Sequence, residues 1–152
     1  MNNTKVKIFI YDLTDGTLKN ASRVILKRKI EAIYHTSVVV YGREYFYSSK
    51  IYWDTPKSTP YGKPVKEVEI GETNITIDEF ECYLKNKLSK KYTEDSYNAI
   101  SNNCNHFTNE AVLFLTGKSI PEITKAKSDL SFKIIVIGNS GVGKIRLLLL
   151  MH

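Results

Sequence analysis

Residues 103–117 of this 152-residue chain read NCNHFTNEAVLFLTG, and this stretch decides the fold. One face of it carries Cys104 together with apolar side chains at helical spacing, namely Phe107, Ala111 and Leu115. Gly117 is the residue type that ends helices in a left-handed conformation, and Pro121 keeps the chain from resuming the helix. The pattern therefore predicts a helix over about 104–116 that begins at a cysteine.

The position of Cys104 makes this cysteine a candidate for chemistry. An asparagine-rich turn at residues 101–103 leads into the helix, so the thiol lies in the first helical turn. The free N–H groups and the dipole of a helix N-terminus stabilise a thiolate, and the same N–H groups can stabilise an oxyanion. Asparagines before a helix are also good caps. Cys104 is thus a candidate nucleophile with thiolate character, and an inert cysteine beside a helix cap is the alternative.

Three histidines compete to act as the base for such a nucleophile. His106 lies two residues after Cys104, which places it about 200° around a helix from the thiol. His152 is the last residue, where nothing would hold it. His35 precedes the apolar run 37–41, and a sheet could hold its imidazole opposite the end of a helix. His35 is therefore the candidate base, and a structural histidine at a strand end is the alternative.

The chain up to about residue 128 mixes strands and helices. Strands are predicted at 6–11, 37–41, 44–47 and 65–70, and helices at 21–30 and from a capping box at 76–79 onward. Residues 48–64 are predicted to form a long loop, which holds three of the four prolines, and loops of this length inside a domain are often functional. No regular alternation of strand, helix and strand is present, which favours an α+β fold.

Bulk composition narrows the class of protein. Apolar residues make up 42% of the chain and charged residues 25%, which is the balance of a soluble globular protein. The longest apolar runs are far shorter than the roughly 20 residues that span a bilayer, so no membrane association is expected. The chain opens without the apolar region and cleavage site of a signal peptide. We therefore expect a cytoplasmic location, with the nucleus as a second option.

The cysteines and the charges exclude further classes. Cys82 and Cys104 are predicted to be free thiols in a reducing compartment, and Cys82, off the apolar face of its predicted helix, is interpreted as inert. No Cys-x-x-Cys or paired histidine spacing occurs, so neither a metal nor a cofactor is expected. The net charge is +6, but the basic clusters at 27–29 and 87–91 lack interleaved aromatic residues, so no nucleic-acid partner is expected.

Several short motifs occur along the chain in a particular order. They are Tyr11-Asp12-Leu13, His35-Thr36-Ser37, Gly42 before Glu44-Tyr45-Phe46-Tyr47, the run Asn103-Cys104-Asn105-His106-Phe107-Thr108-Asn109-Glu110, Phe114-Leu115-Thr116-Gly117 and Ile120-Pro121. This combination resembles the PPPDE family, the permuted papain-fold peptidases that include the desumoylating isopeptidases. The resemblance covers about residues 5–125, and we assign residues 1–128 to a PPPDE peptidase domain.

The resemblance implies both a fold and an activity. The fold is expected to be a circularly permuted papain-like cysteine peptidase, with His35 and Cys104 as the catalytic pair. The expected reaction is cleavage of an isopeptide or peptide bond that follows the Gly-Gly tail of SUMO or ubiquitin, and a homodimer with a groove for this tail is a further implication. A thioesterase that removes S-acyl groups and a non-catalytic module that binds a ubiquitin-like modifier are alternatives. No third catalytic residue is assigned, and Asp12 is a candidate only because it ends the first predicted strand.

Residues 129–152 look different from the rest of the chain. A predicted strand at 131–137 leads into GNSGVGK at 138–144, which matches a phosphate-binding loop up to its lysine, and 147–151 is predicted to be helical. This segment resembles the truncated start of a Rab- or Ras-type small GTPase. Ile145, however, stands where the Ser or Thr that holds magnesium is needed. We therefore expect a loosely docked or disordered remnant that binds no nucleotide.

Overall fold

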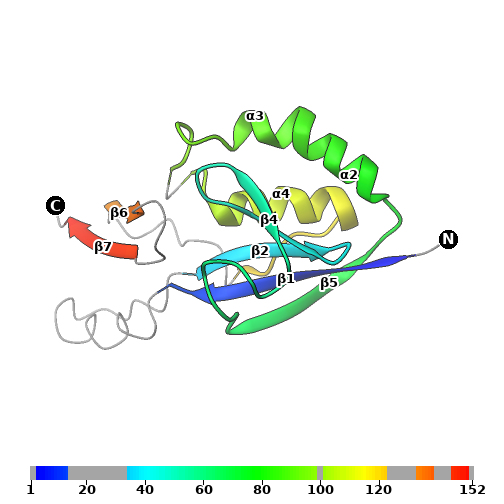
Figure 1. Ribbon diagram of the computed structural model, residues 1–152, viewed down its shortest axis with the longest axis horizontal. Helices are drawn as coiled ribbons and strands as arrows, with labels where there is room; N and C mark the ends of the chain where they lie inside the picture. The colour runs from blue at the N-terminus through cyan, green and yellow to red at the C-terminus, as the bar shows by residue number, and fades with distance from the viewer. Residues whose placement is uncertain (1–2, 14–33, 99–100, 123–132, 139–144, 151–152) are drawn as a thin grey trace.

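The structure is a computed structural model that describes residues 3–13, 34–98, 101–122, 133–138 and 145–150 (Figure 1). Its centre is a five-stranded sheet in the order β4-β3-β2-β1-β5, with every pair antiparallel. The strands are β1 (Thr4–Asp12), β2 (Tyr34–Val40), β3 (Arg43–Tyr47), β4 (Ile51–Asp54) and β5 (Lys66–Thr73). The helical segments are α2 (Ile77–Tyr83), the π-helical η1 (Leu84–Leu88), α3 (Ser89–Lys91) and α4 (Cys104–Thr116). An antiparallel sheet with separate helices confirms the predicted α+β class.

The strands predicted in the first half of the chain are confirmed. β2 lies at the centre of the sheet, between β1 and β3. Tyr41 and Gly42 join β2 to β3 with φ angles of 55° and 70°. Positive φ at both residues is what a type I′ hairpin turn requires, and this turn matches the twist of paired strands. The predicted loop 48–64 differs from expectation, because Ile51–Asp54 pairs with β3 as the short strand β4.

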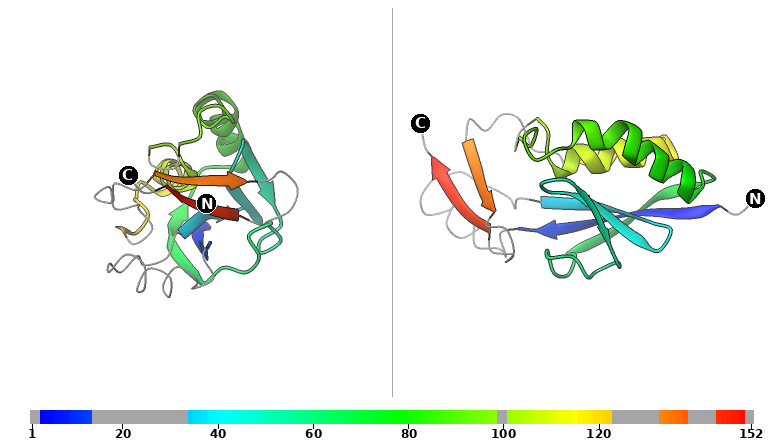
Figure 2. Two further views of the ribbon diagram at one scale, coloured as in Figure 1. Left: turned by 90° about the vertical axis from the view of Figure 1, so that its left-hand side faces the viewer. Right: turned by 45° about the horizontal axis from the view of Figure 1, so that its top comes forward.

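Helices cover one face of this sheet (Figure 2). α2, η1 and α3 follow one another without a break, and together they form a rod that runs alongside α4 (Figure 1). The predicted capping box is present at the start of α2. Thr76 Oγ1 accepts the N–H of Glu79 at 3.2 Å, and the carboxylate of Glu79 accepts the N–H of Thr76 at 2.7 Å. This exchange satisfies two of the free N–H groups of the helix end and fixes where the rod begins.

The core lies between the helices and the sheet, and it includes the predicted apolar face of α4. Phe107 is fully buried, and its ring meets the rings of Tyr92 and Tyr47 at centroid distances of 5.5 and 6.5 Å. The other members of this cluster come from both layers and include Val6, Ile8, Val38, Tyr45, Phe80, Ala111 and Leu115. Because Cys104 begins the helix whose apolar face fills the core, the packing of α4 also determines where the thiol lies.

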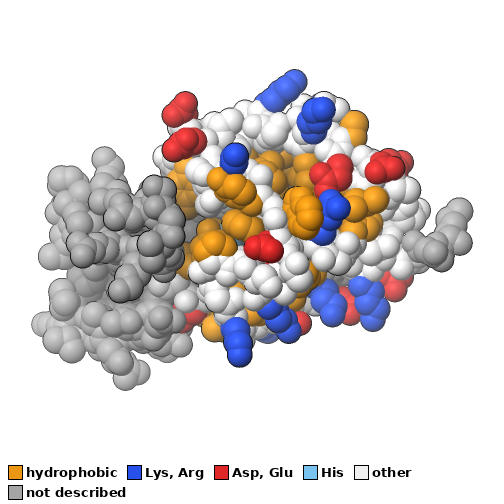
Figure 3. Space-filling model, in the orientation of Figure 1, with side chains coloured by type: hydrophobic (Ala, Val, Ile, Leu, Met, Phe, Trp, Pro, Cys, Tyr) orange, Lys and Arg blue, Asp and Glu red, His pale blue; other side chains and the backbone are white. Residues whose placement is uncertain are grey.

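The hairpin of β3 and β4 presents aromatic side chains to solvent. Tyr52 and Trp53 are exposed, and the guanidinium of Arg43 stacks over the Trp53 ring at 4.0 Å. Arg43 also forms an ion pair with Glu81 of α2 at 3.0 Å. Hydrophobic side chains gather in the middle of this face of the molecule, with charged side chains between and around them (Figure 3). Arg43 thus connects the exposed hairpin to the helical rod.

The two outer strands of the sheet differ in length. β4 has four residues, whereas β5 has eight and pairs with β1. The register between β1 and β5 shifts between Val6 and Lys7, because Val6 lies opposite Gly71 and Lys7 opposite Glu69. Ile70 is therefore an extra residue that forms a bulge in β5. Lys66, Glu67, Glu69 and Glu72 are exposed along this strand.

The last described segments form a separate two-stranded antiparallel sheet of β6 (Lys133–Gly138) and β7 (Ile145–Leu150). The predicted strand at 131–137 is confirmed over the described residues, but the predicted helix at 147–151 is wrong. A continuous leucine run fits a strand as well as a helix, and here it pairs with the apolar residues of β6. Three predicted features lie outside the described residues: the glycine loop 139–144, the boundary at 128 and the helix at 21–30. The division into domains 1–128 and 129–152 therefore stays a prediction.

We expect Phe107→Ala to lower the free energy of unfolding by about 3–5 kcal/mol, because it leaves a cavity between α4 and the sheet. Leu113, on the same helix, is 39% exposed and serves as the matched control. Leu113→Ala should change stability by less than about 1 kcal/mol. Urea denaturation of the three proteins measures both effects, and equal losses would contradict the assignment of the buried face.

Candidate active site

Hydrogen bonds join the start of α4 to the start of β2. The Asn105 side-chain amide donates to the Tyr34 carbonyl at 3.1 Å and its oxygen accepts the Thr36 hydroxyl at 2.7 Å. One turn further on, the Thr108 hydroxyl donates to the Thr36 carbonyl at 3.1 Å. In Figure 1 the N-terminal end of α4 accordingly lies at the end of the sheet where β1 finishes and β2 begins. Both candidate residues are next to residues that form these bonds. His35 lies between Tyr34 and Thr36, and Cys104 directly precedes Asn105.

His35 is buried among aromatic rings at this end of the sheet, with 2% of its surface exposed. It pairs in register with Tyr11 of β1, whose ring centroid lies 5.7 Å from the imidazole. Phe46 of β3 approaches edge-on at 6.3 Å, and Tyr61 stacks on the imidazole at 3.6 Å with 21° between the planes. Burial favours the neutral imidazole and lowers the pKa of His35 from 6.5 to about 3.

Cys104 is the first residue of α4 and is 7% exposed. Asn103 caps the helix, and its side-chain oxygen accepts the N–H groups of Asn105 and His106 at 2.9 and 3.2 Å. Burial raises the pKa of the Cys104 thiol from 9.0 to about 11, although backbone hydrogen bonds from Thr36, Asn105 and Cys104 itself act in the opposite direction. The expected thiolate character is therefore absent in this closed arrangement, because loss of solvation outweighs the helix N-terminus.

His35 and Cys104 lie close to the same residues, but no hydrogen bond joins the imidazole to the thiol. Thr36, next to His35, contributes its backbone to the environment of the Cys104 thiol. Tyr61 stacks on His35 and also lies close enough to Cys104 for a thiolate there to raise the tyrosine pKa, although burial is the larger cause of that rise. His35 Nε2 is buried and has no hydrogen-bond partner among the described residues. The pair is thus assembled as a neutral thiol and a neutral imidazole.

His106 has a structural role that sequence analysis did not assign to it. Its Nδ1 accepts the backbone N–H of Asn103 at 3.2 Å and lies 2.9 Å from the Asn103 side-chain oxygen. Together these contacts form a capping box with a histidine in the third helical position. His106 is therefore held at the helix cap, which agrees with its exclusion as the base.

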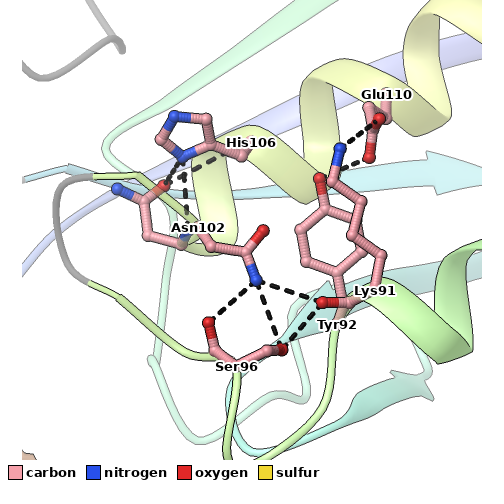
Figure 4. Close-up of polar contacts among 7 residues, drawn as sticks. Lys91, Tyr92, Ser96, Asn102, His106 and Glu110 are labelled. Carbon is pink, nitrogen blue, oxygen red and sulfur yellow. Dashed lines mark hydrogen bonds and ion pairs between the residues drawn. The ribbon is translucent and has the colours of Figure 1, made fainter.

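Polar contacts also fix the segment that leads into Cys104 (Figure 4). The side-chain amide of Asn102 donates to the Ser96 carbonyl at 3.0 Å and to the Lys91 carbonyl at 3.1 Å. The ammonium group of Lys91 is in turn paired with Glu110 of α4 at 2.7 Å, and the same carboxylate accepts the hydroxyl of Tyr92 (Figure 4). The end of the helical rod, the segment before the cysteine and α4 are therefore fastened to one another.

Glu44 is a buried carboxyl group that sequence analysis did not single out as a site residue. It is fully buried on β3, and its Oε1 accepts the hydroxyl of Tyr11 and, at 2.6 Å, that of Ser37. Its Oε2 accepts the backbone N–H of Lys57 at 2.9 Å. Glu44 on β3 thus connects β1, β2 and the segment that follows β4. The glutamate is visible in the motif at 44–47, but its partners are distant in the chain.

The structure describes two of the three remaining candidates, Asp12 and Cys82. Asp12 is opposite Tyr34 in the β1–β2 register, whereas Tyr11 is the residue opposite His35, and its role as a third catalytic residue stays a prediction. Cys82 is exposed on α2 and accepts the side-chain amide of Asn86 at 3.1 Å. His152 lies outside the described residues. Within the described part of the chain no cluster of three potential metal ligands occurs, and no described helix could cross a membrane.

The architecture defines a class of protein. A helix that begins with a buried cysteine and packs across an antiparallel sheet, beside a strand that carries a histidine, is the arrangement of papain-like cysteine peptidases. The model of one family, described as "PPPDE putative peptidase domain", matches residues 4–138. The chain belongs to this PPPDE peptidase family, and the predicted papain-like fold and hydrolase class are confirmed.

Curated relatives agree with this assignment. The chain is 39% identical over 117 residues to desumoylating isopeptidase 1 of Rattus norvegicus, and the aligned region covers 76% of this chain and 70% of that protein. The human protein of the same name gives 38% identity over 117 residues with the same coverage. The Xenopus laevis protein gives 36% over 126 residues, covering 82% of this chain and 75% of that protein. The family match includes β6, and the resemblance of residues 129–152 to a GTPase gains no support from these comparisons.

We expect Cys82 to react with iodoacetamide faster than Cys104 in the native protein at pH 8. Cys82 is exposed, whereas Cys104 is buried and burial raises the pKa of its thiol to about 11. Mass spectrometry after brief labelling locates each adduct. In urea the two rates should converge, which serves as the control, and a faster native reaction at Cys104 would contradict the closed site.

The pKa of His35 predicts how stability depends on pH. In the folded chain the pKa is about 3, below the unfolded value of 6.5, so below pH 6.5 the unfolded state binds a proton that the folded state excludes. Stability that is present above pH 6.5 should therefore be lost as the pH falls toward 3, by on the order of 4 kcal/mol from this group. His35→Phe should lose correspondingly less over the same range. Parallel pH-dependent denaturation curves for the two proteins would refute the assignment.

Proposed function

We propose that this protein is a cysteine isopeptidase that releases SUMO from conjugated proteins, with Cys104 as nucleophile and His35 as base and acid. The observation that carries this proposal is the junction of α4 with β2, which brings the two side chains to one end of the sheet. The family assignment and the names of the relatives support the same activity. SUMO is chosen as the modifier because those relatives are named desumoylating isopeptidases.

The reaction starts from the neutral pair. As the Cys104 sulfur attacks the carbonyl carbon of the isopeptide bond, its proton passes to the free Nε2 of His35. The resulting tetrahedral intermediate collapses when the lysine amine leaves with the proton from His35, and a thioester remains on Cys104. Water then attacks this thioester with His35 as base, which frees the carboxylate of the modifier and restores the thiol.

The first turn of α4 supplies stabilisation for the charges that develop. The caps leave few amides free there, because Asn103 already accepts the N–H groups of Asn105 and His106. The N–H of Cys104 itself acts on the Cys104 sulfur and favours its negative charge. The helix N-terminus thus provides an amide donor beside the nucleophilic sulfur, where negative charge develops as the proton leaves.

Catalytic substitutions test the proposal. On a SUMO conjugate with a fluorogenic amine, wild-type protein should turn over, and Cys104→Ser and His35→Ala should each lower kcat/KM by at least about a hundredfold. Cys82→Ser should keep the wild-type rate and is the matched control. Matching ubiquitin and S-acyl thioester substrates reveal whether deubiquitination or thioester cleavage is the true activity.

The outcomes of this assay separate the hypotheses. Turnover of the thioester without any isopeptide cleavage would replace the proposal with a thioesterase. Binding of SUMO without turnover in pure wild-type protein would leave a modifier-binding module. Homodimer formation, implied by the family resemblance, is a separate prediction that light scattering of the same samples measures.

A further inference from the structure

The segment that joins β4 to β5, residues 55–65, is fastened over the candidate site at both ends. We call it the covering loop. Near its start, the N–H of Lys57, a residue with a φ angle of 68°, donates to the buried Glu44 carboxyl at 2.9 Å. At its end, the N–H of Val65 donates to the carbonyl of Ile10 at 2.8 Å. Both attachments are to strands next to β2, so the loop is positioned relative to His35.

A turn within the covering loop places Tyr61 on the imidazole. The N–H of Gly62 donates to the Thr59 carbonyl at 3.2 Å, and Gly62 itself has a φ angle of 82°. The ring of Tyr61 lies 3.6 Å from that of His35, and it also meets Phe46 edge-on at 5.7 Å and Tyr11 at 5.8 Å. No described residue forms a hydrogen bond with the Tyr61 hydroxyl. Aromatic contact therefore holds this side chain in place.

This placement leaves little space around the reacting atoms. His35 is 2% and Cys104 is 7% exposed, and the ring of Tyr61 stacks on His35 and lies near the Cys104 thiol, so an acyl group that reaches the sulfur has to pass close to this ring. An extended chain of glycines presents no Cβ atoms to such a wall. A residue with a side chain must displace the ring and lose its contacts with three aromatic neighbours.

We propose that Tyr61 is a specificity-determining residue, whose ring closes over the pair of His35 and Cys104 and admits an acyl tail that ends in glycine while rejecting one that ends in a larger residue. This inference rests on the proposed function for its substrate, a modifier tail. The covering of Cys104 by Tyr61 can nevertheless be measured without any turnover.

The first experiment measures the cover directly. Tyr61→Ala should hydrate Cys104 and raise its rate of alkylation by iodoacetamide at pH 8 by about tenfold or more, as expected if the thiol pKa falls by one unit. Tyr61→Phe keeps the ring and should keep the slow rate. Lys63→Ala, an exposed residue in the same loop, is the matched control, and labelling of Cys82 reports on general unfolding.

The second experiment measures selectivity. Two fluorogenic SUMO substrates that end in Gly-Gly and in Gly-Ala are compared for each protein. Wild type and Tyr61→Phe should strongly prefer the first, and Tyr61→Ala should shift the ratio of kcat/KM values by about tenfold toward the second. If Tyr61→Ala does not fold, Tyr61→Leu supplies the same loss of the planar ring.

The proposal has distinct ways to fail. An unchanged alkylation rate in folded Tyr61→Ala would show that the ring does not cover Cys104. An equal fall of both substrates with an unchanged ratio would show that Tyr61 only orients His35, and it would overturn the selectivity claim. If no conjugate is cleaved by wild type, the proposed function is wrong, while the alkylation result still decides whether Tyr61 is the cover.

Discussion

The joint between β2 and α4 is the constraint on which the rest of this structure depends. Thr36 takes part in this joint three times. Its hydroxyl donates to Asn105, its carbonyl accepts the hydroxyl of Thr108, and its backbone forms a hydrogen bond with the Cys104 thiol. A shift of β2 by one residue would reverse its alternation and move Thr36 to the other face of the sheet. The joint would then be lost together with the pairing of His35 and Tyr11. The register of β2 therefore determines both the position of α4 and the geometry of the candidate site.

Burial and the helix N-terminus act on Cys104 in opposite directions, and their magnitudes decide its state. A helix dipole stabilises a nearby negative charge by roughly 0.3–1 kcal/mol in most settings. The thiol pKa still rises from 9.0 to about 11 after the opposing backbone hydrogen bonds are included, which is roughly 3 kcal/mol in favour of the protonated form. Location at a helix start is therefore insufficient for a thiolate. Hydration of the site would remove part of the desolvation penalty and lower the pKa of the Cys104 thiol, so that the helix N-terminus could then stabilise a thiolate.

Local patterns in the sequence predict most of the central sheet, both ends of α4 and the capped start of α2. Cys104 and His35 could be chosen because a helix start and a strand start are visible from neighbouring residues. Glu44 and Tyr61 could not, because their contacts join residues that are distant in the chain, such as Tyr11 with Glu44 and His35 with Tyr61. The protonation state of Cys104 does not follow from the sequence either, since burial of the thiol is a property of the assembled fold. The leucine run of β7 forms a strand and not the predicted helix, and it lacks the polar positions that would separate a helical period from a strand period.

The bulge at Ile70 has a consequence for how separate molecules of this protein behave toward one another. An outer strand with free backbone groups is a template onto which a strand of another chain can add, and such addition can continue into fibres. β5 interrupts that template with an extra residue and surrounds it with carboxylate and ammonium groups. The opposite margin, β4, offers only four residues. Both margins of the central sheet therefore disfavour the addition of a strand from another molecule, which opposes polymerisation of crowded molecules through it.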